Sequence, residues 1–154
     1  MLTNKGKYGL KAMMFLAQRS EGASVPGQEI ADANHIPKQF LNGILLELRA
    51  AGLVRSKKGP GGGYALARCP FAICIGEIVR ALDMPIARLA CTEAGGDVPC
   101  MDCDDPAGCG VRTTMSQVQA AVSGVIDTLT LGELVRSNAG QEPALSDMDL
   151  AGTR

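Results

Sequence analysis

Apolar residues recur every three or four positions in four stretches of the N-terminal half, a spacing that predicts amphipathic helices. The first two helices are expected over residues 2–19 and 28–33. A tight turn follows, and a third helix is expected over residues 37–51. Pro37 suits its first position, because a first helical residue does not need the N–H that proline lacks. A short fourth helix is expected over residues 75–82.

The third predicted helix has two distinct faces. Its apolar stripe is expected in the core and comprises Phe40, Leu41, Ile44, Leu45 and Leu48. Its opposite face carries Lys38, Gln39, Asn42 and Arg49. Beyond this helix, residues 53–56 and 64–67 have strand character and flank a basic, glycine-rich turn. This pattern predicts a β-hairpin with a long tip, so the fold class expected is mainly α with a small hairpin.

The apolar pattern changes to a heptad repeat towards the C-terminus. Six residues alternate between spacings of four and three: Val111, Met115, Val118, Val122, Val125 and Leu129. Such a seam predicts a long helix that pairs with another helix. The domain organisation expected is a winged helix-turn-helix domain over residues 1–84, a cysteine-rich loop over 85–110, a dimerisation helix over 111–136 and a flexible tail over 137–154.

The composition is that of a globular chain. It has 154 residues, 46% hydrophobic and 20% charged, which excludes a disordered or collagen-like chain. Its apolar stretches fall far short of the roughly 20 residues that span a bilayer, and no signal peptide is recognisable. A soluble, cytoplasmic protein is therefore expected. With one histidine and no tryptophan, the chain has few of the side chains that most catalytic sites use, and an enzyme is not expected.

The charge distribution points to a polyanion. Residues 1–68 contain ten Lys and Arg against four Asp and Glu, or +6, whereas the remainder carries −7. Helix, tight turn, helix and hairpin is the winged helix-turn-helix arrangement, whose second motif helix enters the major groove of DNA. The side chains of Gln39 and Asn42 can then form hydrogen bonds with adenine, and that of Lys38 with guanine. The alternative is that these residues form a solvated polar face.

The predicted hairpin tip has the composition of a DNA-contacting wing. Lys57 and Lys58 precede five residues, 59–63, of which four are glycine. Glycines such as Gly61 let backbone N–H groups approach phosphates or the minor groove closely. The alternative is a flexible hairpin loop without a ligand.

Four of the six cysteines are grouped before the predicted long helix. Cys91, Cys100, Cys103 and Cys109 are separated by 8, 2 and 5 residues. Without an export signal a disulfide framework is not expected, and thiols at such spacings bind iron-sulfur clusters or structural zinc. The alternative is four unrelated surface thiols. The other two cysteines, Cys69 and Cys74, are expected to be buried small hydrophobic residues.

The sequence also resembles a known protein family. Gly52-Leu53-Val54 followed by Gly59-Pro60-Gly61-Gly62-Gly63-Tyr64 is similar to the IscR family of winged-helix transcription regulators, which includes the NsrR and RirA types. The similarity runs from residue 2 to about residue 135. It implies a homodimer on pseudo-palindromic operators of double-stranded DNA and, in many members, an iron-sulfur cluster that controls affinity. The candidate DNA contacts are Thr3, Lys5, Tyr8, Gln28, Pro37, Lys38, Gln39, Asn42, Lys57, Lys58, Gly61 and Tyr64.

The resemblance also implies a set of cluster ligands. Cys91, Cys103 and Cys109 best match the three cysteines of the family, although the first interval is longer than usual. The histidine of the IscR type is replaced by Arg112, and residues 1–20 lack the acidic ligand of NsrR-like members. The additional thiol of Cys100 is therefore the best candidate for a fourth ligand. Weaker options are Asp102, Asp104 and Asp105. The RirA type is the nearest comparison, and a 4Fe-4S or a 2Fe-2S cluster is expected.

The function predicted is therefore a DNA-binding transcription regulator, a repressor in its simplest form. An iron-sulfur cluster is expected to control its operator affinity in response to iron, cluster supply, redox state or nitric oxide. One alternative keeps DNA binding but uses the cysteines as a zinc site or a thiol switch. An alternative from another class is an iron-sulfur carrier or enzyme without specific DNA binding, against which the basic N-terminal half argues.

Overall fold

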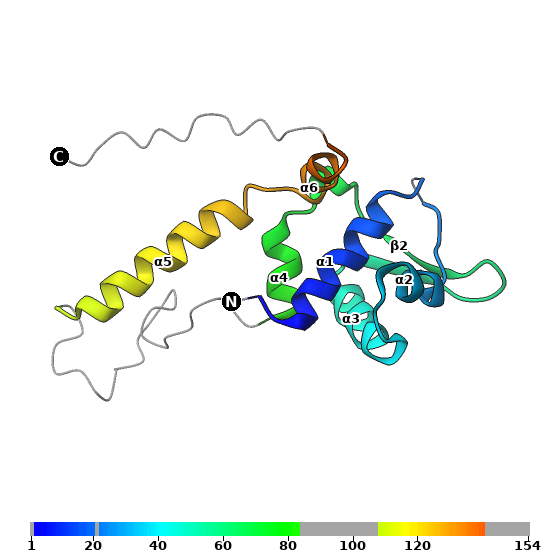
Figure 1. Cartoon of the computed structure of the whole chain (residues 1–154), viewed down its shortest axis with the longest axis horizontal. Helices are drawn as coiled ribbons and strands as arrows, with labels where there is room; N and C mark the ends of the chain where they lie inside the picture. The colour runs from blue at the N-terminus through cyan, green and yellow to red at the C-terminus, as the bar shows by residue number, and fades with distance from the viewer. Residues whose placement is uncertain (1, 21, 84–107, 141–154) are drawn as a thin grey trace.

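The computed structural model describes residues 2–20, 22–83 and 108–140. Helices dominate it, with one antiparallel hairpin (Figure 1), so the expected fold class is confirmed. Its elements in chain order are α1 (Asn4–Ala17), α2 (Gly27–Asn34), α3 (Lys38–Ala50), β1 (Val54–Lys57), β2 (Gly63–Leu66), the short 3-10 helix η1 (Pro70–Ala72), α4 (Ile75–Leu82), α5 (Gly110–Ile126) and α6 (Leu131–Asn138). Among these described helices, none is long and apolar enough to cross a membrane.

Helix α1 lies at the centre and packs against α2, α3, α4 and α6. Its glycines let α4 come close: a Cβ on Gly9 would lie 2.0 Å from Cδ1 of Leu82. The end of α4 therefore meets the beginning of α1. There the buried carboxylate of Asp83 accepts hydrogen bonds from the backbone N–H of Thr3, at 3.0 Å, and from its hydroxyl.

The apolar stripe expected on α3 is confirmed at four of its five positions, because Leu41, Ile44, Leu45 and Leu48 are buried. Phe40 is the exception, with 42% of its surface exposed. It lies at the flank of the stripe, where its ring packs edge-on against that of Tyr8 at a centroid distance of 5.8 Å. The prediction that Phe40 is a core residue is therefore wrong.

The hairpin is present one residue from its predicted bounds. Strands β1 and β2 are antiparallel, with Val54 opposite Leu66 and Lys57 opposite Gly63. Val25 forms a β-bridge with Tyr64 on the free edge of β2, through two backbone hydrogen bonds of 2.8 Å. A Cβ on Gly63 would lie 2.3 Å from the carbonyl oxygen of Val25, so only glycine permits this approach.

The single helix expected over residues 111–136 is instead two helices. Helix α5 ends at Ile126, and α6 begins after Thr130. Thr130 and Glu133 form a capping box, in which the hydroxyl of Thr130 accepts from the N–H of Glu133 and the carboxylate of Glu133 accepts from the N–H of Thr130. Helix α6 packs back on α1 and η1. The heptad spacing predicted one continuous helix, because spacing alone does not show where a capping residue ends one helix and starts the next.

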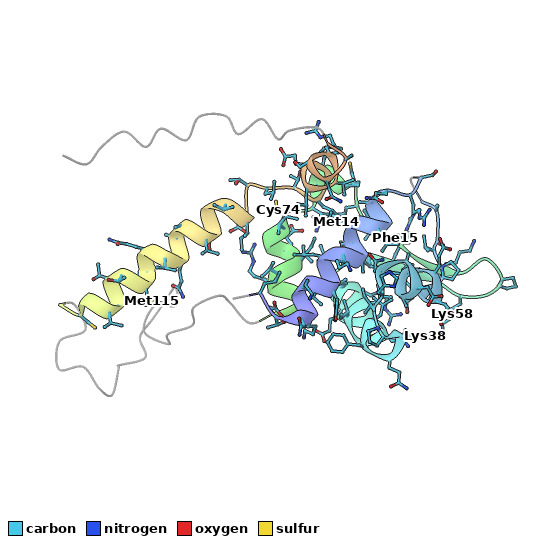
Figure 2. The ribbon with its side chains drawn as sticks, in the orientation of Figure 1. Met14, Phe15, Lys38, Lys58, Cys74 and Met115 are labelled. Carbon is cyan, nitrogen blue, oxygen red and sulfur yellow. The ribbon has the colours of Figure 1, made fainter. Side chains whose placement is uncertain are left out.

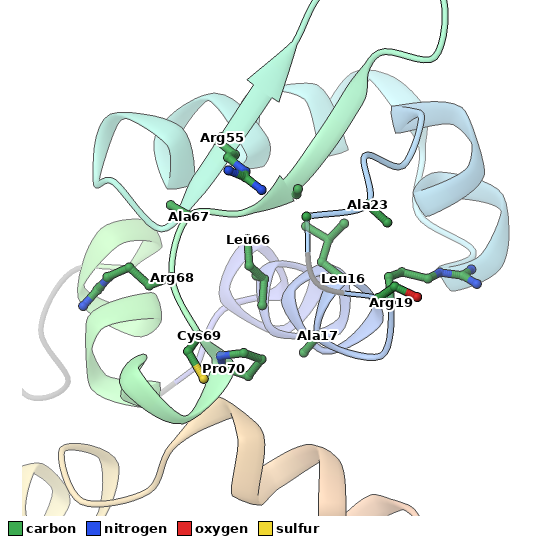
Figure 3. Close-up of a pocket in the computed structure, with 13 residues that line it drawn as sticks. Leu16, Ala17, Arg19, Ala23, Arg55, Leu66, Ala67, Arg68, Cys69 and Pro70 are labelled. Carbon is green, nitrogen blue, oxygen red and sulfur yellow. The ribbon is translucent and has the colours of Figure 1, made fainter.

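The two cysteines expected in the core are not buried. Cys69 is exposed and Cys74 is half-buried. Cys69 comes directly before η1, where the chain leaves the hairpin, and lines a cavity of about 320 Å³ together with Leu16, Arg55 and Leu66 (Figure 3). A small apolar residue type thus predicted burial at a position that the chain path places at the surface.

Candidate nucleic-acid interface

The sequence places α3 with its N-terminus open to solvent. His35 ends α2 in the left-handed conformation, with φ of 54°, and the chain turns at once so that Ile36 is buried. Pro37 then precedes the first turn of α3, which within the described part of the chain has no side-chain cap. The first backbone N–H groups of α3 are consequently available to a phosphate group, as at other helix N-termini.

The exposed face of α3 carries the side chains that the sequence predicted. Lys38, Gln39 and Asn42 are all exposed, opposite the buried stripe. Gln39 and Asn42 lie three residues apart, which places them side by side on a helix. Both can present an amide to a base edge, which donates and accepts at the same time.

Two residues on this face were missed by the sequence analysis. Leu46 is 57% exposed although its neighbour Leu45 is fully buried. Gly43 has no atom of the described residues within 4 Å of the position that a Cβ would occupy. The helical period would have identified both, because Gly43 lies four residues after Gln39 and Leu46 four residues after Asn42, on the same face.

The wing is fixed beside α3. Arg49, in the last turn of α3, donates a hydrogen bond of 3.1 Å to Ser56 of β1. Lys57 and Lys58 are exposed beyond it, and Gly59 and Gly61 of the tip have positive φ values of 93° and 70°. Figure 2 shows Lys38 and Lys58 at the end of the molecule opposite α5.

The surface formed by α3 and the wing is strongly basic. From Lys38 to Leu66, the span of α3 and the hairpin, the sequence has five Lys and Arg and one acidic residue, Glu47. That carboxylate is paired with Lys5 of α1 at 2.8 Å. A negatively charged polymer is therefore attracted to this surface over its whole length.

Three of the remaining predicted contacts, Thr3, Tyr8 and Gln28, have internal partners. The hydroxyl of Thr3 caps α1 by accepting a hydrogen bond from the N–H of Gly6. The ring of Tyr8 is half-buried and packs on that of Phe40. Gln28 donates to Asp32 at 2.8 Å. These residues keep their neighbours in place.

Tyr64 is half-buried at the root of the wing. Its ring lies against Gly27, where a Cβ would be 3.4 Å from Cε2 of the tyrosine. This contact, next to the Val25 bridge, attaches the hairpin to the start of α2. Pro37 and Gly61 are both exposed, one before α3 and one in the tip.

Of the four cysteines expected to bind a cluster, only Cys109 lies within the described residues. Cys91, Cys100 and Cys103 lie outside them. Cys109 is half-buried at the N-cap position of α5, and Arg112 is in the first turn that follows. Within residues 2–20, 22–83 and 108–140 no three His, Cys, Asp or Glu side chains form a metal-binding group.

Helix α5 presents an apolar stripe without cover. Figure 1 shows it extending away from the helices around α1, and within the described structure none of its residues is buried. Val111, Val118 and Val125 follow one another at intervals of seven and are 64%, 41% and 55% exposed. At its C-terminal end Asp127 pairs with Arg80 of α4 at 2.7 Å.

Comparisons with known proteins agree with this geometry. The profile of the Rrf2 family, described as iron-dependent transcriptional regulators, matches residues 2–137. An rrf2-like HTH-type transcriptional regulator of Rhodobacter capsulatus is 39% identical over 150 residues, 96% of this chain and 100% of that protein. The HTH-type transcriptional regulator IscR of Vibrio campbellii is 34% identical over 153 residues, 99% of this chain and 88% of that protein.

Two solved structures have the same architecture. CymR, the global cysteine regulator of B. subtilis, superposes with a TM-score of 0.72 and 31% identity, covering 89% of this chain and 97% of that one. IscR of T. potens superposes with a TM-score of 0.69 and 28% identity, covering 96% and 93% of the two chains. The likeness extends over nearly the whole molecule.

Proposed function

The chain belongs to the Rrf2 family of iron-dependent transcriptional regulators, and we propose that it reads an operator with α3 and the wing while an iron-sulfur cluster sets its affinity. It is a DNA-binding transcription regulator and not an enzyme. One observation supports this mode of DNA recognition: the N-terminus of α3 has no side-chain cap among the described residues and lies beside exposed amide side chains. A basic wing, held to α3 by the hydrogen bond from Arg49 to Ser56, flanks it.

In the proposed complex the two basic elements have different tasks. Lys38, Gln39 and Asn42 reach base edges in the major groove, and the wing lysines neutralise phosphates. Asn42→Ala is expected to weaken binding to a selected operator by about 1 to 3 kcal/mol and to relax preference at one base pair. Asn138→Ala, at the exposed end of α6, is the matched control. Equal losses on operator and random duplexes would contradict base reading by Asn42.

We further propose that α5 pairs with α5 of a second copy. In the described structure the valines at intervals of seven are exposed, and a homodimer would cover them with an identical stripe. Two copies also present two recognition helices, whose half-sites lie about 34 to 36 Å apart or at multiples of that distance. Val118→Lys is expected to give a monomer in analytical ultracentrifugation and to abolish operator binding. A dimeric variant would show that the stripe is covered in another way.

The donor chemistry of the cysteine-rich region fits an iron-sulfur cluster. Four thiols occur within 19 residues, and thiolates are the usual ligands of such clusters. Cys109 stands at the N-cap of the 17-residue helix α5, where first-turn N–H groups favour negative charge. We propose Cys91, Cys103 and Cys109 as ligands and Cys100 as the fourth. A bound cluster would supply a redox-active centre at the entry to the proposed dimer helix.

Cluster control is tested on the full-length protein purified without oxygen. Iron, sulfide and zinc are measured per chain, and operator Kd is measured by fluorescence anisotropy before and after chelation of the metal. Stoichiometric iron and sulfide and a Kd that changes on removal are expected. Zinc in place of iron, or an unchanged Kd, would contradict the proposal. Cys109→Ser is expected to lose the cluster, whereas Cys69→Ser, an exposed cysteine outside the ligand set, keeps it.

A further inference from the structure

Leu46 is exposed in an unusual place. Most other large exposed hydrophobic side chains of the described residues have a partner or belong to a stripe: Phe40 packs on Tyr8, Phe71 lies under the guanidinium of Arg136, and the valines belong to α5. Leu2, 45% exposed, lies beside Gly6 near the start of the described chain. Leu46 stands instead on the polar face of α3, four residues after Asn42. An isolated exposed leucine is ordinary on a protein surface, so its position must decide its meaning.

That position is part of a regular pattern. Gln39, Asn42, Gly43 and Leu46 have the relative spacing 0, 3, 4 and 7, which is the spacing that a helix lying in the major groove uses to reach base edges. Along the helix axis Leu46 is about 6 Å from Asn42 and about 10 Å from Gln39, at 1.5 Å per residue. At about 3.4 Å per base pair these separations correspond to roughly two and three base pairs.

Gly43 strengthens this assignment. Its backbone is ordinary helix, because it is not among the described glycines with positive φ. No described atom approaches its Cβ position, so the fold does not require glycine there. Glycine is a poor helix former, yet here it leaves a bare stretch of backbone between Gln39 and Leu46. A bare helix surface allows close approach to a ligand.

We infer that Leu46 contacts the C5-methyl group of a thymine. This thymine lies about two base pairs from the base read by Asn42 and about three from the base read by Gln39. The thymine methyl is the apolar group that base edges display in the major groove, and a leucine side chain is its natural complement. Gly43 provides the room for α3 to come within contact distance. This inference rests on the proposed function, because it requires α3 to be the recognition helix.

The test combines a protein variant with a single-group change in the DNA. Operators are first selected from a random duplex pool with the full-length protein. Each thymine of the half-sites is then replaced by deoxyuridine, which removes only the methyl group, and Kd is measured for wild type, Leu46→Ala and Leu46→Met. At one thymine per half-site the replacement is expected to weaken wild-type binding about fourfold, or about fifteenfold when made in both half-sites, as for burial of one methyl group.

Leu46→Ala is expected to be insensitive to that replacement, and Leu46→Met to retain most of the sensitivity. The inference is overturned if wild type and Leu46→Ala respond alike at every thymine, or if the selected half-sites have no thymine at the required separation. Asn42→Ala distinguishes this failure from a failure of the proposed function. If it binds operator like wild type, or loses affinity equally for operator and random duplexes, α3 does not read the bases. If it loses affinity for the operator alone, only the role of Leu46 is refuted.

Discussion

Replacing Gly43 by alanine is expected to stabilise the protein and weaken its binding to DNA. Gly43 lies inside α3 with ordinary helical backbone, and apart from its chain neighbours and the backbone of its own helix no described atom is within 4 Å of the new methyl group. Alanine in a helix interior is favoured over glycine by about 0.5 to 1 kcal/mol. The free energy of unfolding should rise by that amount, because nothing in the described structure opposes the methyl group.

The same methyl group is expected to obstruct the DNA interface. It would project between Gln39 and Leu46, from the part of α3 that we propose to lie nearest the base edges. Overfilling a close-packed contact costs about 1 to 3 kcal/mol, which corresponds to a roughly five- to 150-fold weaker operator affinity. Stability and binding therefore change in opposite directions, which general damage to the fold does not produce.

Urea unfolding and anisotropy titrations measure the two effects separately. Gly124→Ala is the matched control, because Gly124 is also a helical glycine with open space around its Cβ position and lies in α5. It should gain similar stability without a change in operator Kd. If Gly43→Ala gains stability and binds operator as tightly as wild type, this face of α3 does not touch DNA. If it loses stability, the space around Gly43 is not open.

Three further outcomes are expected. Lys58→Ala should weaken operator and random duplexes alike and reduce the slope of log K against log salt by about one; a loss confined to the operator would contradict a phosphate contact. Asp83→Ala should lower the free energy of unfolding by about 1 to 3 kcal/mol in urea, because two donors of Thr3 lose their buried acceptor. Hydrogen bonds from the side chain and then the backbone of Thr130 hold the pKa of Glu133 below its usual 4.5. Its contribution to stability is therefore present above pH 4.5 and lost as pH falls through the lower folded pKa, and Glu133→Gln should remove this pH dependence.

The sequence predicted the helices well because each has a continuous apolar face, and the comparisons confirm the resemblance to IscR-type regulators. Its errors have particular causes. Phe40 lies at the edge of a stripe, where periodicity alone cannot separate core from surface. The break between α5 and α6 could have been found, because Thr130 and Glu133 have the spacing of a capping box. The exposure of Cys69 follows from the path of the chain, which residue type does not report.

The polar part of the candidate interface was predicted from the sequence, but Leu46 and Gly43 were overlooked. Lys38, Gln39 and Asn42 stand opposite an apolar stripe, so their exposure followed from the helical period. Leu45 and Leu46 are adjacent and chemically identical, yet one is fully buried and the other is 57% exposed. The helical period separates them, because Leu45 lies four residues after buried Leu41 and Leu46 lies four residues after exposed Asn42.

A chain of contacts runs from a residue just before the cysteine-rich region to α3. Asp83, the last described residue before residues 84–107, binds Thr3 at the start of α1, and Asp127, after the end of α5, binds Arg80 of α4. From α1, Lys5 reaches Glu47 of α3. Coupling free energies between sites are typically 1 to 3 kcal/mol, equal to a five- to 150-fold change in affinity. One buried, charge-assisted hydrogen bond contributes about the same amount. The contact between Asp83 and Thr3 therefore has a free energy of the size that the proposed control of DNA binding would need.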